Sequence, residues 1–324
     1  MGRDYQMEMP IRYFSEVTVR KVDWLWYPYI PFGKISVIQG DPGDGKTTLI
    51  LNIAALLSKG LSMPGLDSAS SAGCIIYQSA EDGAEDTLKP RLMSAGANCA
   101  QIAFIDESEY GLTLNDARIE DAINETKARL LVLDPLQAYL GDGNELNRAD
   151  GVRPILKQLA AMAERTGCAI VMIGHMNKAS GSKSIYRGLG SIDITAVARS
   201  VLLVGRIKND PSVRVMAQIK NSLAPEGRPI AFEIHEDSSV HWIGEYDITV
   251  DELLNGDSDA SSDSGKVPMV MEKLTELLSG ESVPCTRVYE VFREMDVGKR
   301  TVDRAKKSLG VQSVKRADGW YWRL

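Results

Sequence analysis

The first 250 residues alternate between short apolar runs and segments with helical spacing of apolar residues. KISVIQG (34–40) has the composition of a buried strand, and TTLILNIAALLSKG (47–60) has apolar residues at helical intervals. The alternation continues with strand-like runs at 73–83, 101–107, 128–136 and 168–178, and helical patterns at 85–97, 115–127 and 152–167. This order predicts an α/β fold in which a parallel sheet carries helices on both faces.

The pattern changes beyond Thr195. The runs at 196–207, 213–221 and 230–237 are strand-like, but turns instead of helices separate them. Parallel strands need long crossover connections, whereas antiparallel strands are joined by short turns. We therefore expect these runs to extend one edge of the sheet as antiparallel strands.

A polar segment predicts a domain boundary. NGDSDASSDSG (255–265) has no apolar residue larger than Ala, so it cannot bury enough surface to offset its conformational entropy. We expect a flexible linker there. The predicted divisions are an N-terminal arm (1–22), a core (23–250), the linker (251–265) and a C-terminal domain (266–324).

The C-terminal domain has a pattern of its own. Helical spacing at 267–279, 286–295 and 299–310 is followed by two short strand-like pieces around Asp318-Gly319, which is a hairpin signal. Two helices, a tight turn, a basic helix and a hairpin are typical of a winged helix-turn-helix.

Charge is distributed unevenly over the 324 residues. Residues 266–324 carry twelve Lys or Arg against eight Asp or Glu, a net of +4, whereas the rest carries 25 against 36, a net of −11. A basic appendage on an acidic body favours nucleic-acid binding. The candidate DNA contacts there are Arg300, Arg304, Lys306 and Lys307. Winged helices also bind proteins, so duplex DNA and a protein partner are both open.

Composition and termini bear on location. The hydrophobic fraction of 44% and the charged fraction of 25% are those of ordinary globular proteins. No run of eighteen apolar residues occurs, the N-terminus lacks the apolar core of a signal peptide, and the four cysteines have no metal-ligand spacing. We expect a cytoplasmic protein with reduced thiols and no membrane contact.

GDPGDGKT (40–47) matches the phosphate-binding pattern G-x-x-x-x-G-K-[ST], and it lies between a predicted strand and a predicted helix, as the mechanism requires. Glycines let backbone amides curl around phosphate oxygens, and the helix that begins at Lys46 directs its positive end toward them. Lys46 would reach the β- and γ-phosphates, while Thr47 and Asp134 would hold Mg²⁺. The predicted cofactors are ATP and Mg²⁺, bound by Gly40, Asp41, Pro42, Gly43, Asp44, Gly45, Lys46, Thr47, Thr48 and Asp134.

Two acidic residues at strand ends carry the predicted chemistry. Asp134 ends the apolar run LLVLDPL and fits the Walker B aspartate. Hydrolysis also needs a group that polarises the attacking water, but Pro135 stands where many such ATPases have Glu. We assign this role to Glu81 in YQSAEDG, with Asp82 as the alternative. Its strand is expected to lie beside the P-loop strand, so that Glu81 faces the γ-phosphate.

These segments together resemble the hexameric replicative helicases of the RecA/DnaB superfamily, most closely the small RepA-like AAA-family ATPases of plasmids, phages and mobile elements. The resemblance covers about residues 30–235 and rests on GDPGDGKTT, SAEDGAEDTLKPRL, LLVLDPL, GHMNK, RGLGS, ARSVL and QIKNSLAPEG. It implies a RecA-like ATPase core with Glu81 as the catalytic glutamate. His175, at the end of IVMIGH, would couple the γ-phosphate to the DNA-binding loops.

In that family a neighbouring subunit of the ring completes each nucleotide site. Arg199 in AVARSVL matches the arginine finger best, and Arg206 is the alternative. Lys220 in QIKN resembles the lysine of a K-x-R element, but Ser222 replaces its arginine, so the contact from the neighbour must be partly rebuilt. Only about 33 residues precede the P-loop strand, so we expect an arm there instead of the N-terminal domain of DnaB-type helicases.

The resemblance also implies loops that bind single-stranded DNA in a central channel. The segments 141–150 and 177–190 are polar and Gly-rich, and they follow the strands of Asp134 and His175. Lys178, Lys183 and Arg187 would contact phosphates there, without sequence preference.

Two hypotheses follow. The first is an ATP-dependent DNA helicase that forms a ring and couples hydrolysis to translocation on single-stranded DNA during replication of a mobile element. The resemblance implies that this ring is a hexamer. The alternative is a RecA-class DNA-binding ATPase that does not unwind DNA and acts as a helicase loader, recombination mediator or regulator.

Overall fold

The computed structural model describes residues 13–141, 149–175, 192–207, 210–255, 267–280, 282–295, 297, 299–316 and 319–324. The chain divides into two compact units, Met1–Val250 and Asp251–Leu324. The first unit packs two apolar clusters and the second has one of its own.

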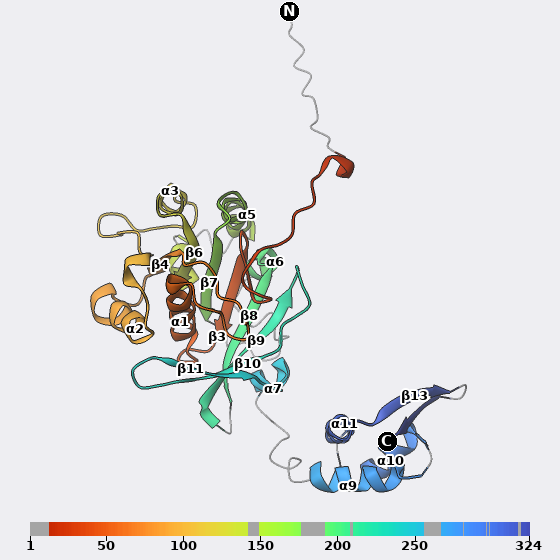
Figure 1. Cartoon of the computed structure of the whole chain (residues 1–324). Helices are drawn as coiled ribbons and strands as arrows, with labels where there is room; N and C mark the ends of the chain where they lie inside the picture. The colour runs from red at the N-terminus through yellow and green to blue at the C-terminus, as the bar shows by residue number, and fades with distance from the viewer. Residues whose placement is uncertain are drawn as a thin grey trace, which may run out of the picture. The chain divides into compact units, whose positions relative to one another are not determined.

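A nine-stranded sheet forms the centre of the first unit (Figure 1). From one edge to the other its strands are β5 (Ile102–Ala103), β4 (Cys74–Ser79), β6 (Ala128–Asp134), β7 (Ala169–His175), β3 (Ile35–Gly40), β8 (Ser200–Ile207), β9 (Asp210–Asn221), β10 (Ile230–Ile234) and β11 (Val240–Glu245). Pairing is parallel from β5 to β8 and antiparallel from β8 to β11. The predicted α/β fold, a mostly parallel sheet with an antiparallel extension, is confirmed.

The strand that precedes Glu81 lies elsewhere than we expected. β4 pairs with β5 and β6, and both β6 and β7 separate it from the P-loop strand β3. The expectation that β4 and β3 are neighbours was wrong. β6 and β7 are apolar and buried almost along their whole length, which suits central strands covered on both faces. β4 therefore lies one place further out.

Helices cover both faces of the sheet, as predicted. On one face lie α1 (Lys46–Lys59), the π-helix η2 (Ala84–Leu88) and α2 (Lys89–Ser94), and on the other lie α3 (Ala117–Thr126) and α5 (Ala149–Thr166). Successive residues of a strand point to opposite faces, so Ile38 joins the cluster with α1 while Val37 joins the cluster with α3 and α5. A short helix, α6 (Ile192–Val197), precedes β8.

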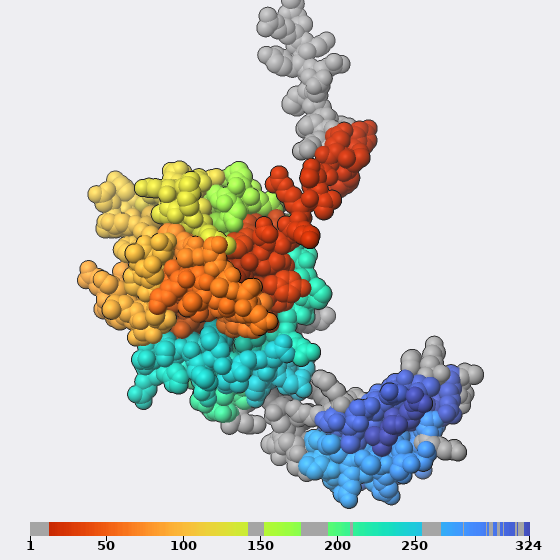
Figure 2. All heavy atoms as spheres, viewed as in Figure 1, coloured from red at the N-terminus to blue at the C-terminus, as the bar shows by residue number. Residues whose placement is uncertain are grey.

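The aromatic segment 23–33 packs on the core through Leu25, Trp26, Tyr29 and Ile30. It forms a small antiparallel pair, β1 (Trp24–Trp26) and β2 (Ile30–Pro31). Trp26 is 1% exposed and its Nε1 donates a hydrogen bond to the carbonyl oxygen of Pro64 at 2.9 Å. Residues 13–22, in contrast, project from the body as an exposed segment (Figure 2).

Beyond α7, the described part of the second unit has three helices and a three-stranded sheet. Its elements are α9 (Val267–Leu278), β12 (Val283–Pro284), α10 (Cys285–Glu294), α11 (Lys299–Ser308), β13 (Gln312–Arg316) and β14 (Gly319–Arg323). The strands pair antiparallel in the order β12-β14-β13. Val270, Leu274, Phe292, Val302 and Trp322 form its core. The predicted helices and hairpin are therefore present.

The predicted linker begins later than expected. VDELLN forms a short helix, α7 (Val250–Asn255), in which Leu253 is 8% exposed. Asp251 and Glu252 lie in its first turn, where carboxylates stabilise a helix. The remainder of the predicted linker, 256–265, lies outside the described residues.

Within the described part of the chain, no helix combines the length and the apolarity that a membrane span requires. The longest, α5, has eighteen residues but carries charged residues along its length.

Candidate nucleotide site

The carboxyl ends of four parallel strands meet at one edge of the sheet. Gly40 at the end of β3 is level with His175 at the end of β7, and Ser79 at the end of β4 is level with Asp134 at the end of β6. Ligands of open α/β sheets bind at this edge. The register thus brings the predicted P-loop, Asp134, His175 and the segment of Glu81 together.

The P-loop glycines are required by close packing. Gly45 has a φ of 93° and starts α1 from a left-handed conformation, which glycine adopts readily. A Cβ on Gly45 would lie 2.5 Å from Cδ1 of Ile234, and one on Gly40 would lie 2.2 Å from the carbonyl oxygen of Val204. The loop is therefore a backbone-lined cradle at the N-terminus of a long helix, which fits a phosphate group.

Lys46 is a buried cation within this cradle. Its side chain is 4% exposed, and Nζ donates hydrogen bonds to the carbonyl oxygens of Gly40 at 2.9 Å and Asp41 at 2.8 Å. Nζ also lies 3.4 Å from Nδ1 of His175. Burial lowers the pKa of Lys46 below its ordinary value. The carboxylates of Asp44, Asp134, Asp41 and Glu81 act in the opposite direction on this pKa, but the hydrogen bonds of Nζ to oxygen go to backbone carbonyl groups. A phosphate would add a direct anionic partner.

Thr47 and Asp134 meet beside Lys46. Oγ1 of Thr47 donates to Oδ2 of Asp134 at 2.7 Å, and the hydroxyl of Tyr77 donates to the same oxygen at 3.0 Å. Burial raises the pKa of Asp134, although both hydrogen bonds act in the opposite direction. A hydroxyl and a carboxylate are the hard oxygen ligands that Mg²⁺ takes alongside nucleotide phosphates. The pair therefore fits the predicted cation.

Tyr77 is a residue of this site that sequence analysis missed. It lies within β4, its side chain is buried, and burial together with Asp134 raises its pKa well above the ordinary value. The available signal was the phenol group of Tyr77, which directly follows Ile75 and Ile76 in the strand CIIYQS. Its partner depends on β4 lying beside β6, which the local pattern does not reveal.

Glu81 and Asp82 occupy different environments. Oε1 of Glu81 lies 4.0 Å from Nε2 of His175, and the Glu81 side chain is 64% exposed. Asp82 is instead held by an ion pair of 3.0 Å with Arg91. Because the Lys46 ammonium can only donate, His175 Nδ1 is the acceptor, and a neutral ring then carries its proton on Nε2, toward Glu81. This geometry favours Glu81 over Asp82 as the group that faces the γ-phosphate.

The residues predicted to act on a neighbouring subunit make contacts within their own chain. Nζ of Lys220 donates to the carbonyl oxygens of Thr195 at 2.7 Å and Ala198 at 2.8 Å, at the C-terminal end of α6. Nη2 of Arg206 donates to the carbonyl oxygen of Gly43, in its own P-loop. Arg199 is exposed, and the backbone N–H of Ser222 donates to the Arg199 carbonyl oxygen. The trans roles of these residues stay predictions.

The predicted DNA contacts fall mostly outside the described residues. Lys178, Lys183 and Arg187 lie in the undescribed segment 176–191, and so does most of the 141–150 loop. Arg300, Arg304 and Lys307 belong to α11, but the structure does not describe their side chains. The Lys306 ammonium lies 4.1 Å from the ring centroid of Trp322 and donates to Oγ of Ser313 at 2.7 Å.

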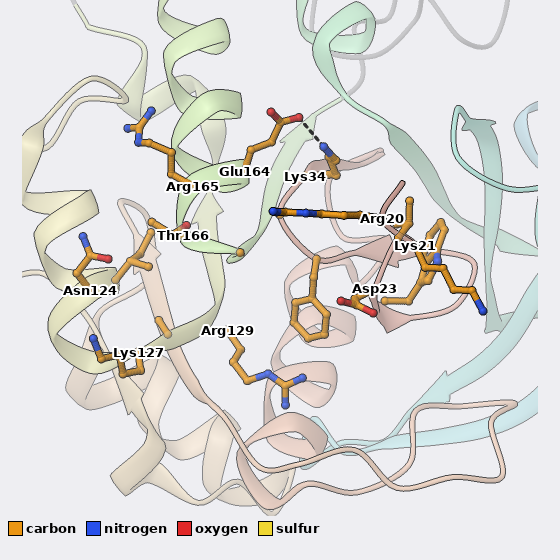
Figure 3. Close-up of a pocket in the computed structure, with 17 residues that line it drawn as sticks. Arg20, Lys21, Asp23, Lys34, Asn124, Lys127, Arg129, Glu164, Arg165 and Thr166 are labelled. Carbon is orange, nitrogen blue, oxygen red and sulfur yellow. Dashed lines mark hydrogen bonds and ion pairs between the residues drawn. The ribbon is translucent and has the colours of Figure 1, made fainter. Parts of the chain in front are cut away.

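A second feature of the first unit is a cavity of about 940 Å³ at the opposite end of the sheet (Figure 3). It is lined by residues that precede β3 and β7 and begin β6, and the Lys34–Glu164 ion pair borders it. Several cations line it, among them Lys127 and Arg165 at the C-terminal ends of α3 and α5. Cations stabilise such helix ends, so their placement is explained without a ligand. This cavity is separate from the P-loop edge.

Comparisons with known proteins agree with the geometry. A family model described as an AAA domain matches residues 10–181, which include the P-loop, Glu81, Asp134 and His175. DNA repair protein RadA of Bacillus subtilis (strain 168) is 25% identical over 247 residues, covering 74% of this chain and 48% of that protein. Protein RecA of Blastochloris viridis is 23% identical over 285 residues, covering 82% of this chain and 78% of that protein. The chain thus spans about half the length of this RadA protein.

Proposed function

The chain belongs to the AAA domain family, among the RecA-like P-loop ATPases, and from that premise we propose that it hydrolyses Mg²⁺-bound ATP to act on DNA. One observation carries the proposal above others. Lys46 is a buried ammonium with neutral hydrogen-bond partners, placed in a glycine-lined loop beside the Thr47–Asp134 pair. Mg²⁺-ATP would supply an anion for the ammonium and the loop amides, and a cation for the hydroxyl and carboxylate oxygens of Thr47 and Asp134.

The roles of the residues follow from their positions. Lys46 and the loop amides bind and orient the phosphates, and Thr47 and Asp134 hold the cation, which when bound offsets the phosphate charge. Glu81 orients and polarises the attacking water as general base. His175 lies between Lys46 and Glu81, so its ring responds to the presence of the γ-phosphate. A movement of the ring changes its distance to Lys46 and its distance to Glu81 together.

We favour DNA unwinding by a ring of subunits as the action that hydrolysis drives. The support is a pair of residues. Glu81 follows β4 and is not the sequence neighbour of the Walker B aspartate, and His175 is the last residue of β7. In this proposal the ring is a hexamer that translocates on single-stranded DNA. The second unit acts as a winged helix that engages duplex DNA or a protein partner through α11 and the β13–β14 hairpin.

The names of the relatives favour a second candidate. The RadA relative is named a DNA repair protein, and neither its name nor that of the RecA relative mentions a helicase. A RecA-class ATPase that binds DNA without unwinding it would act as a loader, mediator or regulator. Its site residues would be the same.

A forked-duplex unwinding assay run beside an ATPase assay separates the candidates. We expect the full chain to hydrolyse ATP faster with single-stranded DNA and to unwind the fork, with both activities lost in Lys46→Ala. Stimulated hydrolysis without unwinding would select the second candidate. Failure of the wild-type chain to bind ATP in the presence of Mg²⁺ would overturn both.

A further inference from the structure

The phosphate loop of this chain is acidic. GDPGDGKT places two carboxylates, Asp41 and Asp44, in the loop that is proposed to receive a polyanion. The Asp44 side chain is only 14% exposed, and its Oδ2 accepts a hydrogen bond of 3.0 Å from the backbone N–H of Asp41. A carboxylate this close to a triphosphate repels it, and the repulsion is strongest where water is excluded. Binding therefore needs a nearby countercharge in addition to Lys46.

The antiparallel extension brings two guanidinium groups to the loop. Arg206 on β8 and Arg214 on β9 are cross-strand partners. Nη2 of Arg206 donates to the carbonyl oxygen of Gly43, and its Nε lies 3.5 Å from Oδ1 of Asp44. Arg214 lies against Gly45, where an added Cβ would come within 3.1 Å of its Cδ.

The guanidinium group of Arg214 is only partly paired. Its Nη1 donates to the carbonyl oxygen of Ser212 at 2.9 Å, whereas its buried Nε has no hydrogen-bond partner in the described structure. Burial and the neighbouring Arg206 lower the pKa of Arg214 below its ordinary value. A negative charge at the loop would give the Nε of Arg214 a hydrogen-bond acceptor. It would also offset the repulsion between the Arg206 and Arg214 guanidinium groups.

We propose that Arg206, supported by Arg214, is a positioning residue of the nucleotide site of its own subunit. It neutralises Asp44 and holds the Gly43 carbonyl oxygen toward β8, away from the phosphates. This inference rests on the proposed function, because it assigns Arg206 to the ATP site. It differs from the role of an arginine finger from a neighbouring subunit, since the guanidinium is engaged in its own P-loop.

The proposal predicts a specific pattern of nucleotide affinity. Arg206→Ala leaves Asp44 uncompensated, so ATP should bind about tenfold more weakly. Adding Asp44→Asn to that variant removes the repulsion and should restore most of the affinity. Arg206→Lys keeps the charge but not the two-point contact, so it should be intermediate. Arg228→Ala is the matched control, because Arg228 is 78% exposed and pairs with Glu245 on the same extension.

The experiment is an equilibrium titration of the full chain with a fluorescent ATP analogue and Mg²⁺, with thermal unfolding of each variant beside it. The expected result is rescue of the ATP affinity of Arg206→Ala by Asp44→Asn while the midpoints of thermal unfolding stay equal, because an arginine that only stabilises the loop would lower the midpoint together with the affinity. Equal affinities for Arg206→Ala and Arg228→Ala would overturn the proposal while leaving the ATPase assignment intact. Weak binding that Asp44→Asn does not restore would also overturn it. Failure of wild type to bind, in contrast, removes the proposed function itself.

Discussion

The two halves of the nine-stranded sheet contribute to the P-loop in different ways. The parallel half, from β5 to β3, presents Asp134, His175 and the Glu81 segment at the carboxyl ends of its strands. On the other side of β3, β8 is also parallel to it and places Arg206 near its own carboxyl end, while the antiparallel strand β9 places Arg214 beside the same loop. The acidic and histidine side chains thus lie on one side of the P-loop strand, and the arginine side chains lie on its other side, on β8 and the first antiparallel strand β9. Four substitutions test this division, from the largest expected effect to the smallest.

Lys46→Ala tests the parallel half most directly. The variant loses the cation that binds the β- and γ-phosphates, so we expect the rate of ATP hydrolysis to fall by about a thousandfold. Phosphate release under saturating Mg²⁺-ATP measures it. Lys59→Ala is the control, because Lys59 is exposed in the last turn of the same helix. If the Lys46→Ala variant hydrolyses ATP near the wild-type rate, the nucleotide site does not lie at the carboxyl ends of these strands.

Glu81→Gln removes the proposed general base while keeping its shape. Because Glu81 is 64% exposed, stability and nucleotide affinity should stay near wild type while kcat falls by about a hundredfold. Asp82→Asn is the matched comparison, since Asp82 is tied to Arg91. A larger loss of kcat in Asp82→Asn than in Glu81→Gln would reverse the assignment.

Asp134→Asn separates binding chemistry from stability. Burial raises the pKa of Asp134 in the folded state above its value in the unfolded state. Ionisation of Asp134 at neutral pH therefore lowers the free energy of unfolding. This free energy rises again as the pH falls through the folded-state pKa toward the unfolded-state pKa. The variant should lose Mg²⁺-dependent hydrolysis. Without nucleotide, its midpoint of thermal unfolding at neutral pH should rise by about 2 °C, a gain that disappears in acid. A lower midpoint at neutral pH would contradict this account.

Lys220→Ala probes the antiparallel half. The ammonium bonds the last carbonyl groups of α6, so its loss should lower the free energy of unfolding by about 1 kcal/mol. Arg199→Ala, at an exposed neighbour, should leave stability unchanged and lower only ATPase activity if it completes the next subunit's site. Denaturant unfolding and ATPase assays on both variants measure this. Reduced activity with unchanged stability in Lys220→Ala would instead favour a trans role.

Local patterns predicted the elements well because the physics behind them is local. Apolar periodicity placed α1, β6 and β7, and the glycines with Lys46 predicted a strand–loop–helix unit that the structure contains. The order of strands was beyond such patterns. β4 was expected beside β3, but burial of the more apolar β6 and β7 places them between the two.

The sequence by itself determined the α/β class, the antiparallel extension and the phosphate loop, while the roles of Lys46, Asp134 and Glu81 stay predictions. Each depends on residues close in the chain. Only the tertiary structure decided that Tyr77 bonds Asp134, that Lys220 caps α6 and that Arg206 lies on its own P-loop. These pairs join residues far apart in sequence, and strand order, not local propensity, brings them within hydrogen-bond distance.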